Sequence, residues 1–458
     1  MKSRMTVEDL HSQGYDTVIV AAPDMHGRLI GKRLTPTKFE SILDSGIAVS
    51  SCTFGWDLPQ NIGLNVPYAG WHTGWRDFML VPDMATLVPA AWLESTAIVI
   101  ADIVEEYDRK PVEITPRRIL QRQITCLAER GLKVEVGTEL EFYLYREGYD
   151  ELRSGGFQKL TPSTLVHSDY TVQQVNAWEP FFRRLRNYLD ATGIDVEMSQ
   201  GEWGLGQWEI TLKYGDALDM CDRHTLFKLA VKDVATQAGL SATFMPKPVA
   251  TGVGSSCHVH VSLKDLSASD GTSTPAFPFW SDTSSDHMSE TMKHAVGGIL
   301  AHAPDLMAIY APTINSYRRT NSSEFAGNGA TWGYDNRTVS CRVLGTAPTS
   351  MRAEWRVPGA DTNAYLTVAA VIASINDGIA NETDPGPASH GDSYQKDDGV
   401  RFSPHLGQAA DTLRASAFAK EAFSEPVVEQ YAIAAQWEWQ QFLEAVTDWE
   451  LDRYYENI

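Results

Sequence analysis

At 458 residues the chain is long enough for a large core and, on length alone, for two or more domains. Hydrophobic residues make up 43% and charged residues 21%, as in ordinary globular proteins, and the formal net charge of -21 argues against nucleic acid or an anionic membrane as the main partner. A polar N-terminus and the lack of a run of about twenty apolar residues predict a cytoplasmic protein without a signal peptide or membrane span.

The cysteines are dispersed and form no CxxC motif: Cys52, Cys126, Cys221, Cys257 and Cys341. An odd, scattered set of this kind is typical of reduced thiols in a cytosolic protein. We therefore expect buried free thiols, and neither a disulfide framework nor a zinc knot.

The first quarter of the chain has the pattern of a small β-rich unit. Short apolar segments predict strands at 17–22, 29–34, 78–83 and 97–102. The Asp- and Gly-containing connection after the first strand predicts a hairpin, and residues 39–45 predict a short helix. Because the stretch 105–111 is polar, we expect an N-terminal domain over residues 1–107 and a larger domain over residues 108–458.

The strand after a predicted helix at 116–130 carries the first candidate ligands. Apolar and polar residues alternate from Val134 to Leu144, which gives this strand one apolar face. Glu139 and Glu141 project from its other face, about 7 Å apart along the strand. Two such carboxylates repel each other unless water, a cation or a proton relieves the repulsion. In isolation the pair fits a solvated strand face as well as a metal site.

Two later segments add polar side chains that suit the same site. Three glycines lie between Glu202 and Glu209, and a tight backbone path of this kind brings the two glutamates near one another. After a second glycine-rich turn, His258, His260 and Ser262 share one face of a predicted strand. Glycine-rich turns before polar-faced strands explain each segment without any ligand, but two histidines at i and i+2 favour binding. The second turn lacks the Lys-Ser/Thr of a P-loop.

The last charged strand is dominated by arginine, because Arg352, Glu354 and Arg356 share one face. Planar guanidinium groups of this kind grip carboxylate or phosphate oxygens. The remaining pattern predicts loops at 146–168 and 264–285, and helices at 178–192, 226–238, 288–301, 364–376 and 427–446.

Five glutamates and a histidine beside an arginine cluster predict a site for divalent metal. Donor sets rich in carboxylate favour Mg²⁺ or Mn²⁺ over zinc. Several divalent ions together with several arginines are the equipment for phosphoryl transfer from a nucleoside triphosphate.

From about residue 15 to its C-terminus, the sequence resembles the glutamine synthetase superfamily. The matching motifs are Gly-x-Glu-x-Glu-Phe at 137–142, Glu-x4-Gln-x-Glu at 202–209, Lys-Pro…Gly-x3-His-x-His-x-Ser at 247–262, Asn-Ser-Tyr-x-Arg at 315–319, Asn-Arg-x4-Arg at 336–342 and Arg-x-Glu-x-Arg at 352–356. The resemblance implies an α+β fold, with a small N-terminal β-grasp domain and a larger catalytic domain. The curved antiparallel sheet of that catalytic domain would form a funnel surrounded by helices. It also implies a ring-stacked homododecamer with active sites between subunits.

The resemblance implies a role for each matching residue. Glu141, Glu202 and Glu209 would hold the metal near the amino-acid substrate, and Glu139, His258 and Glu354 the metal on the ATP phosphates. Arg319 would bind the α-carboxylate of glutamate beside Gly254, Arg356 would bind the γ-carboxylate, and Arg337 and Arg342 the transferring phosphate. His260, Ser262 and Arg352 would border the nucleotide. In the family reaction ATP phosphorylates the γ-carboxylate, and a nitrogen nucleophile then attacks the acyl phosphate.

Two departures from the ammonia-using members of the family concern the ammonium site. Segment 48–54 lacks the Asp that those enzymes carry there, and Phe325 stands where they have a glutamate that closes the ammonium pocket. Because ammonium needs nearby anions to offset its desolvation, the loss predicts a larger, partly apolar amine. Phe325 could offer that amine a cation–π contact. A loop shift of one residue would instead return Glu324 to the catalytic role of the missing carboxylate.

The segment 356–365 resembles the γ-glutamylpolyamine and γ-glutamylethanolamide synthetase branch, and Val253 replaces the Asn usual before the pocket glycine. We therefore expect an ATP-dependent ligase of amine catabolism that joins L-glutamate to a primary amine, with Mg²⁺ or Mn²⁺ as cofactor. The alternatives are an ammonia-using glutamine synthetase and a non-catalytic regulator of nitrogen metabolism. Polyamine, ethanolamine, alkylamine and aniline all stay open as the amine.

Overall fold

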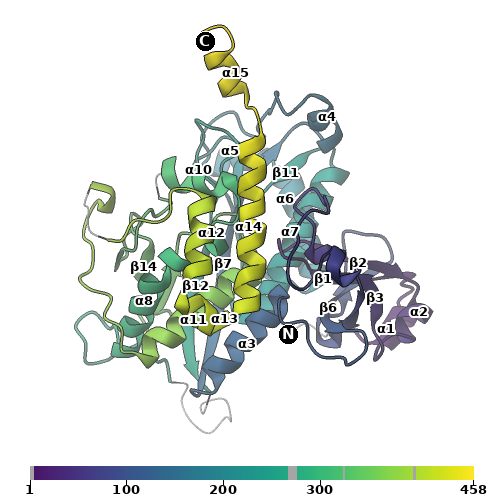
Figure 1. Cartoon of the computed structure of the whole chain (residues 1–458), viewed down its shortest axis with the longest axis horizontal. Helices are drawn as coiled ribbons and strands as arrows, with labels where there is room; N and C mark the ends of the chain where they lie inside the picture. Colours follow the sequence, from purple (N-terminus) through teal and green to yellow (C-terminus); the bar gives the residue numbers. More distant parts are fainter. Residues whose placement is uncertain (1–4, 267–275, 323–324, 396–398) are drawn as a thin grey trace.

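The computed structural model describes residues 5–266, 276–322, 325–395 and 399–458 and builds them around two β-sheets. Figure 1 shows the smaller sheet with its helices at one side of a larger body, in which helices surround the second sheet. The fold mixes α and β structure and consists of a small N-terminal sheet and a larger curved sheet, as the sequence predicts. No helix in the described ranges is long and apolar enough to cross a bilayer.

The smaller sheet contains β1 (Thr17–Pro23), β2 (Leu29–Leu34), β3 (Ile47–Ser50), β4 (Asp77–Pro82), β5 (Val88–Pro89) and β6 (Thr96–Glu105). Its order is β2-β1-β6-β4-β3, with β5 also paired to β6. The antiparallel register of β1 and β2 confirms the predicted hairpin, whereas β1 and β6 run parallel. All six strands end by residue 105; the division of the chain at residue 107 stays a prediction.

The helix predicted at 39–45 is displaced toward the N-terminus. It runs as α2 (Pro36–Glu40), after α1 (Val7–Ser12), and residues 41–45 form turns. The hydroxyl of Thr35 accepts a hydrogen bond from the backbone N–H of Lys38, and Pro36 occupies the first turn, where its missing N–H is not needed. The helix therefore begins at Pro36, after the capping residue Thr35, and not at the apolar residues from which the prediction was made.

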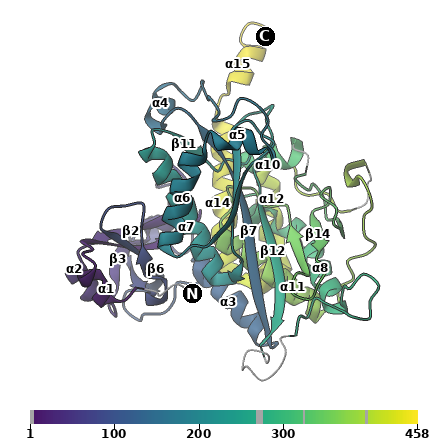
Figure 2. The same ribbon diagram turned by 180° about the vertical axis from the view of Figure 1, so that it is seen from behind.

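The larger sheet contains β7 (Leu132–Tyr145), β8 (Val196–Gly201), β9 (Gln207–Leu212), β10 (Gly215–Asp216), β11 (Ser241–Thr243), β12 (Cys257–Asp265), β13 (Trp332–Tyr334), β14 (Cys341–Leu344) and β15 (Arg352–Trp355). Its order is β13-β14-β15-β12-β7-β9-β8, and β10 and β11 also pair with β7. Figure 2 shows β7 and β12 as long neighbouring strands in the middle of the body. The apolar face of β7 is buried: the ring of Phe142 packs against those of Phe182 and Phe244.

Helices cover the larger sheet and continue to the C-terminus: α3 (Pro116–Ala128), α4 (Tyr149–Ser154), α5 (Val172–Asn176), α6 (Glu179–Thr192), α7 (Ala217–Gln237), α8 (Glu290–His302), α9 (Met307–Tyr310), α10 (Ile314–Ser322), α11 (Ala364–Ala380), α12 (Leu406–Ala415), α13 (Ala417–Phe423), α14 (Glu425–Glu444) and α15 (Asp448–Tyr454). Helix α11 is almost wholly buried and packs against α3 and α8. The short helix α4 interrupts the loop predicted at 146–168, where the hydroxyl of Tyr149 donates to the carbonyl of Ala242 at 2.6 Å.

A buried ion-pair network joins the smaller sheet to the helices of the larger body. Arg117 of α3 donates two hydrogen bonds to Asp222 of α7, at 3.0 and 2.9 Å. It also reaches Asp102 at 2.6 Å and Asp83 at 2.7 Å, two carboxylates that belong to β6 and to the end of β4. Burial opposes the charge of Arg117, but Asp222 and Asp102 outweigh it and raise the pKa of the guanidinium.

All five cysteines are free, as predicted. Cys221, Cys257 and Cys341 are buried, and burial raises their pKa values. The prediction of burial is wrong for Cys126, which is exposed on α3, and Cys52 is half-buried. Cys126 lies on the solvent-facing side of the amphipathic helix α3, where a small thiol does not affect the packing of the core.

Candidate active site

The strand register brings the predicted polar residues onto one face of the larger sheet. His258 of β12 lies directly opposite Glu139 of β7, and His260 lies opposite Glu354 of β15. Directly opposed residues of antiparallel strands point to the same face of the sheet. The side chains of β7, β12 and β15 therefore meet above the centre of the sheet.

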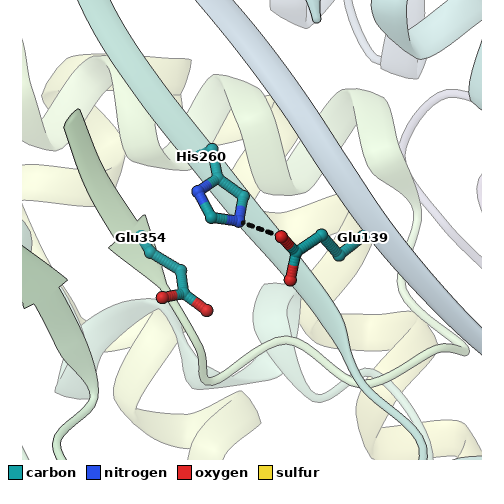
Figure 3. A group of neighbouring side chains, drawn as sticks. All are labelled: Glu139, His260 and Glu354. Carbon is teal, nitrogen blue, oxygen red and sulfur yellow. Dashed lines mark ion pairs between the residues drawn. The ribbon is translucent and has the colours of Figure 1, made fainter. Parts of the chain in front are cut away.

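Figure 3 shows Glu139, His260 and Glu354 converging from these three strands. They offer ligand atoms that all lie within 4.8 Å of one another. His258 lies beside them, with its Nδ1 atom 3.4 Å from Oε2 of Glu139 and 3.5 Å from Oε1 of Glu354. Its Nε2 atom is buried and has no hydrogen-bond partner among the described residues. Two carboxylates and an unpartnered imidazole nitrogen are a donor set that fits a divalent cation.

The two histidines differ in how they are held. Arg352 donates from Nε to Nδ1 of His260 at 3.1 Å, so a neutral His260 carries its proton on Nε2. That atom faces Oε1 of Glu139 at 2.9 Å. In the part of the chain that the structure describes, Nε2 of His260, like that of His258, has no hydrogen-bond partner. Because Arg352 holds only Nδ1 of His260, either histidine can offer Nε2 to a cation, and the assignment of His258 to the metal stays a prediction.

The protonation states of the group suit metal binding. Burial opposes the charge of Glu139, but hydrogen bonds from His258 and His260 hold its pKa well below its usual value. Burial likewise opposes the charge of Glu354, but His258 and Arg356 lower its pKa to about 2. Burial and the charge of Arg356 lower the pKa of His258. Ionised carboxylates and a neutral imidazole are the forms that coordinate a metal.

A second group of carboxylates lies farther along the same face. Glu141 is directly opposed to Glu209 of β9, and the glycine-rich turn between β8 and β9 places Glu202 close enough to repel both. Burial and the charge of Glu139 raise the pKa of Glu209 to about 9, and burial and Glu141 raise that of Glu202 to about 8. Within the described residues no basic side chain forms an ion pair with these three glutamates. A cation bound between them would remove the repulsion.

Gln207 connects this second group to the glycine predicted for the substrate pocket. Its side-chain amide, almost fully buried, donates to Oε2 of Glu141 at 2.7 Å and to the carbonyl of Gly254 at 2.9 Å. Its Oε1 atom accepts from the backbone N–H of Gly204 at 2.9 Å. No role for Gln207 was expected from the sequence. The only indication there was that Gln207 shares a strand face with Glu209.

Arginines close one side of the site. Arg342 donates from Nη1 to Oε2 of Glu354 at 3.0 Å, and Arg356 donates from Nη1 to Oε1 of the same carboxylate at 2.5 Å. Arg342 also contacts Asp335. Burial opposes the charge of Arg342, but the hydrogen bonds with Asp335 and the charge of Glu354 raise its pKa. Glu354 therefore lies between a candidate cation site and two guanidinium groups.

Ser262 and Arg352 mark the rim of the site on the side of His260. Ser262 donates to the carbonyl of Met351 at 2.9 Å, and Arg352 donates to the carbonyl of Ser350 at 3.0 Å. The Ser262 contact ties the loop between β14 and β15 to the polar face of β12, whereas the Arg352 contact is local to the start of β15. Their predicted position beside a nucleotide stays a prediction.

Arg319 is placed differently from the other arginines. It lies on α10 and is 1% exposed. Its guanidinium donates to the carbonyls of Val357 at 2.7 Å and Arg356 at 3.0 Å, and to the hydroxyl of Ser256 at 2.8 Å. These bonds fix the chain just after the end of β15 and connect it to Ser256, next to β12. Binding of a carboxylate by Arg319 stays a prediction.

Phe325 lies next to the arginine predicted to bind the γ-carboxylate. Its side chain is 50% exposed, its φ angle is 61°, and its carbonyl accepts from Nη2 of Arg356 at 3.5 Å. A positive φ is uncommon for an aromatic residue and marks a sharp change of chain direction after α10. Glu324, the alternative pocket carboxylate, lies outside the described residues.

Three side chains near the site were not expected from the sequence. Asp169 and Tyr170, in the turn before α5, lie close enough to Arg337 for its charge to oppose the rise in their pKa values that burial causes. Arg337 itself is exposed. Burial raises the pKa of Tyr394, whose phenol lies within the field of Arg356 and Arg319. Each comes from a loop without a motif, so only the fold identifies it.

Comparison with known proteins identifies the family and the fold of the chain. Residues 113–454 match the family model described as glutamine synthetase, catalytic domain. The chain is 38% identical over 457 residues to gamma-glutamylethanolamide synthetase GlnA4 of Streptomyces coelicolor, a match that covers 99% of this chain and 96% of that protein. It is 34% identical over 462 residues to glutamate–isopropylamine ligase of a Pseudomonas species, covering 100% and 99% of the two chains. The solved structure "Apo GmaS without ligand" shares the fold with a TM-score of 0.85 at 24% identity, over 99% of this chain and 100% of that one.

Proposed function

The chain belongs to the glutamine synthetase family, and from this membership we propose that it is an ATP-dependent ligase that joins the γ-carboxylate of L-glutamate to an organic primary amine. The observation that carries the proposal is the convergence of Glu139, His258 and Glu354 with the guanidinium groups of Arg342 and Arg356 on one sheet face. Carboxylates for divalent metal beside arginines for phosphate are the equipment of phosphoryl transfer.

The proposed reaction has two steps. An oxygen of the γ-carboxylate attacks the γ-phosphorus of ATP, the bond to the bridging oxygen breaks, and ADP leaves. The nitrogen lone pair of the amine then attacks the acyl carbon, phosphate leaves, and the nitrogen loses a proton. Arg356 would orient the γ-carboxylate, while Arg337 and Arg342 would offset the charge on the transferring phosphoryl group.

Mg²⁺ or Mn²⁺, when bound, would offset the charge of the ATP phosphates and of the glutamate carboxylate. We assign Glu139, His258 and Glu354 to the ion on the phosphates, and Glu141, Glu202 and Glu209 to the ion near glutamate. Arg319 and Gly254 belong to the α-carboxylate pocket in this proposal. His260, Ser262 and Arg352 border the nucleotide.

The choice of an organic amine over ammonium rests on Phe325. The residue is half-exposed and its backbone carbonyl accepts from Arg356, and in the sequence it stands where the ammonia-using enzymes are expected to carry a carboxylate. An apolar ring lowers the cost of burying the hydrocarbon part of an amine and provides no anion for bare ammonium. Two relatives, one named for an ethanolamide product and one for its isopropylamine substrate, support this choice. A role in cytoplasmic amine catabolism is part of the same proposal.

We further propose the ring-stacked dodecamer of the family, in which a neighbouring subunit completes each site. Large side chains are available for contacts between copies, since Trp71 is 79% exposed and Tyr455 of the C-terminal segment is 81% exposed. Analytical ultracentrifugation tests this assembly independently of the reaction.

The reaction is tested by phosphate release from ATP in the presence of glutamate and Mg²⁺. The assay compares ammonium with ethanolamine, methylamine, isopropylamine, putrescine and aniline, and mass spectrometry confirms each product. We expect an organic amine to be used in preference to ammonium. Preference for ammonium would overturn the proposed amine and point to Glu324 as the pocket carboxylate. ATP binding without turnover for any amine would instead support the non-catalytic alternative.

A further inference from the structure

A cavity of about 650 Å³ separates the smaller sheet from the helices of the larger body, away from the candidate active site. Its walls come from the β1–β2 turn, from residues 57–64, from one face of α7, from residues 243–246 and from α14. The volume lies within the range of sites that bind small molecules.

Two lysines form a basic end of this cavity. Lys228 and Lys232 are one turn apart on α7, and both line the cavity. Within the described residues no carboxylate forms an ion pair with either lysine; Lys228 donates only to the carbonyl of Ala360, at 3.0 Å. Burial lowers the pKa of both ammonium groups, and the nearby Asp361 only partly offsets this for Lys228.

Two carboxyl groups form an acidic end. Asp57 and Glu438 both line the cavity, and the charge of Asp57 adds to the rise that burial causes in the pKa of Glu438. Asp57 accepts hydrogen bonds only from the backbone and side chain of Asn61, at 2.7 and 3.1 Å. In the part of the chain that the structure describes, no basic side chain forms an ion pair with Asp57 or Glu438. Among the described residues neither end thus contains an ion pair, although the Lys228 ammonium lies over the ring of Phe244 at 5.0 Å and Lys232 is exposed. Arg28, a third cation of the cavity wall, is paired with Asp24.

The wall between the two ends is mainly apolar. Leu64, Phe244, Ile309, Leu366 and Trp437 line it. Four buried polar atoms of the lining residues have no hydrogen-bond partner among the described residues: Nε2 of His26, Nη2 of Arg28, Oδ1 of Asp361 and Nε1 of Trp437. Nη2 of Arg28 lies 2.8 Å from Asp24, which offsets its charge. Buried polar atoms are normally hydrogen-bonded, so the other three mark places for ligand or water atoms.

We propose that this cavity binds a small zwitterion with a carboxylate at one end, a protonated amine at the other and an aliphatic chain between them. The carboxylate pairs with Lys228 and Lys232, the ammonium group with Asp57 and Glu438, and the chain covers the apolar wall. A ligand with one charge satisfies only one end and leaves the other buried and unpaired.

The cavity is linked to the residues of the proposed glutamate pocket. Asn315, at its wall, exchanges hydrogen bonds with the backbone of Lys247 at 2.8 and 3.0 Å, just before the turn that contains Gly254. Asp361 accepts from Ser316 at 2.6 Å, on the helix that carries Arg319. A ligand that orders these segments would change the affinity for glutamate, and glutamate would change the affinity for the ligand equally.

The test is calorimetric titration of the intact protein, without ATP, with 6-aminohexanoate, hexanoate and hexylamine. We expect 6-aminohexanoate to bind at least about tenfold more tightly than either singly charged analogue. Glu438→Gln and Lys232→Gln should each weaken its binding about tenfold. Glu444→Gln, an exposed change on the same helix α14, should leave binding unchanged.

Glu354→Gln separates the cavity from the candidate active site. Binding of 6-aminohexanoate that survives Glu354→Gln and is lost in Glu438→Gln supports the proposal. Binding that depends on Glu354 and is indifferent to Glu438 and Lys232 overturns it, as does the absence of binding at millimolar concentration. Neither result changes the outcome of the amine assay, so the two proposals can fail separately.

Discussion

Gln207 donates its side-chain amide to Oε2 of Glu141 at 2.7 Å and to the carbonyl of Gly254 at 2.9 Å, and so holds a candidate metal ligand against the substrate pocket. Replacing it by Leu leaves Glu141 free to turn. Because such supporting contacts are typically worth 10- to 100-fold, we expect the Mg²⁺ concentration for half-maximal phosphate release to rise by about that factor. Gln440→Leu, an exposed change on α14, is the control. An unchanged Mg²⁺ dependence in Gln207→Leu would show that Glu141 is held by other means.

His258 and His260 should respond differently to replacement. Because Arg352 donates to Nδ1 of His260, whereas no arginine among the described residues hydrogen-bonds to His258, His258→Asn should weaken Mn²⁺ binding by about tenfold or more. His260→Asn should mainly raise the KM for ATP. Mn²⁺ binding is measured by electron paramagnetic resonance. Equal effects of the two variants on Mn²⁺ binding would assign both histidines to the cation.

Phe325→Glu restores a carboxylate where the ammonia-using relatives carry one. We expect kcat/KM for ammonium relative to the best organic amine to rise by about tenfold or more, since an anion offsets the desolvation of ammonium. Phe325→Leu serves as a control that changes the ring without adding charge. If the ratio of the two kcat/KM values is the same in both variants, the charge at this position does not select the amine.

Arg117→Met should destabilise the fold, because it leaves the buried carboxylate of Asp222 without a cation, with the hydroxyl of Tyr365 still donating to it, and cuts the link to Asp83 and Asp102. Breaking one partner of a buried pair costs about 3–5 kcal/mol in the free energy of unfolding. The matched change Arg118→Met removes only a partly exposed pair with Glu113 and should cost about 0–1 kcal/mol. Denaturant unfolding measures both values. Similar losses in the two variants would contradict a structural role for the network.

His224 should make the stability depend on pH. Burial, helped by the charge of Lys228, lowers its pKa from 6.5 to about 3, and its Nδ1 atom lies 3.1 Å from the hydroxyl of Thr138. Below pH 6.5 His224 binds a proton in the unfolded chain but not in the folded chain. The free energy of unfolding therefore falls as the pH falls toward 3. The slope from this residue reaches about 1.4 kcal/mol per pH unit.

The measurement for His224 is the free energy of unfolding between about pH 4 and pH 6.5. His224→Asn should flatten its decline with falling pH, even if the variant is less stable throughout. His72→Asn, an exposed change in the smaller domain, should keep the slope of the unaltered chain. An unaltered slope in His224→Asn would mean that other titrating groups cause the loss of stability at low pH.

The sequence predicted the faces of individual strands well, because alternation is a local property. The polar faces of β7 and β12 and the hairpin of β1 and β2 all follow from period-two patterns. Which strand pairs with which is not local, so the opposition of His260 to Glu354 needed the fold. The same holds for Gln207, Asp169 and Tyr394, whose contacts cross long stretches of chain.

Arg319 shows another limit of sequence reasoning. A motif reports that an arginine is present, but not whether its guanidinium faces a pocket or the backbone. In this structure the guanidinium donates hydrogen bonds to the carbonyls of Val357 and Arg356 and to the hydroxyl of Ser256. The displaced start of α2 is a smaller error. The N-cap Thr35 and the helix-starting Pro36 were present in the sequence, but the prediction followed the apolar residues instead.

The pairing of β7, β12, β15 and β14 has a consequence for how such a protein can diverge. Adding or deleting one residue within any of these strands would turn every following ligand into the apolar core. Changes of length are tolerated better in the connections between strands, and the segment after α10 that carries Phe325 is one of them. A change in that connection would leave the polar faces of the strands unaltered, so the proposed choice of amine and the candidate metal site can vary separately.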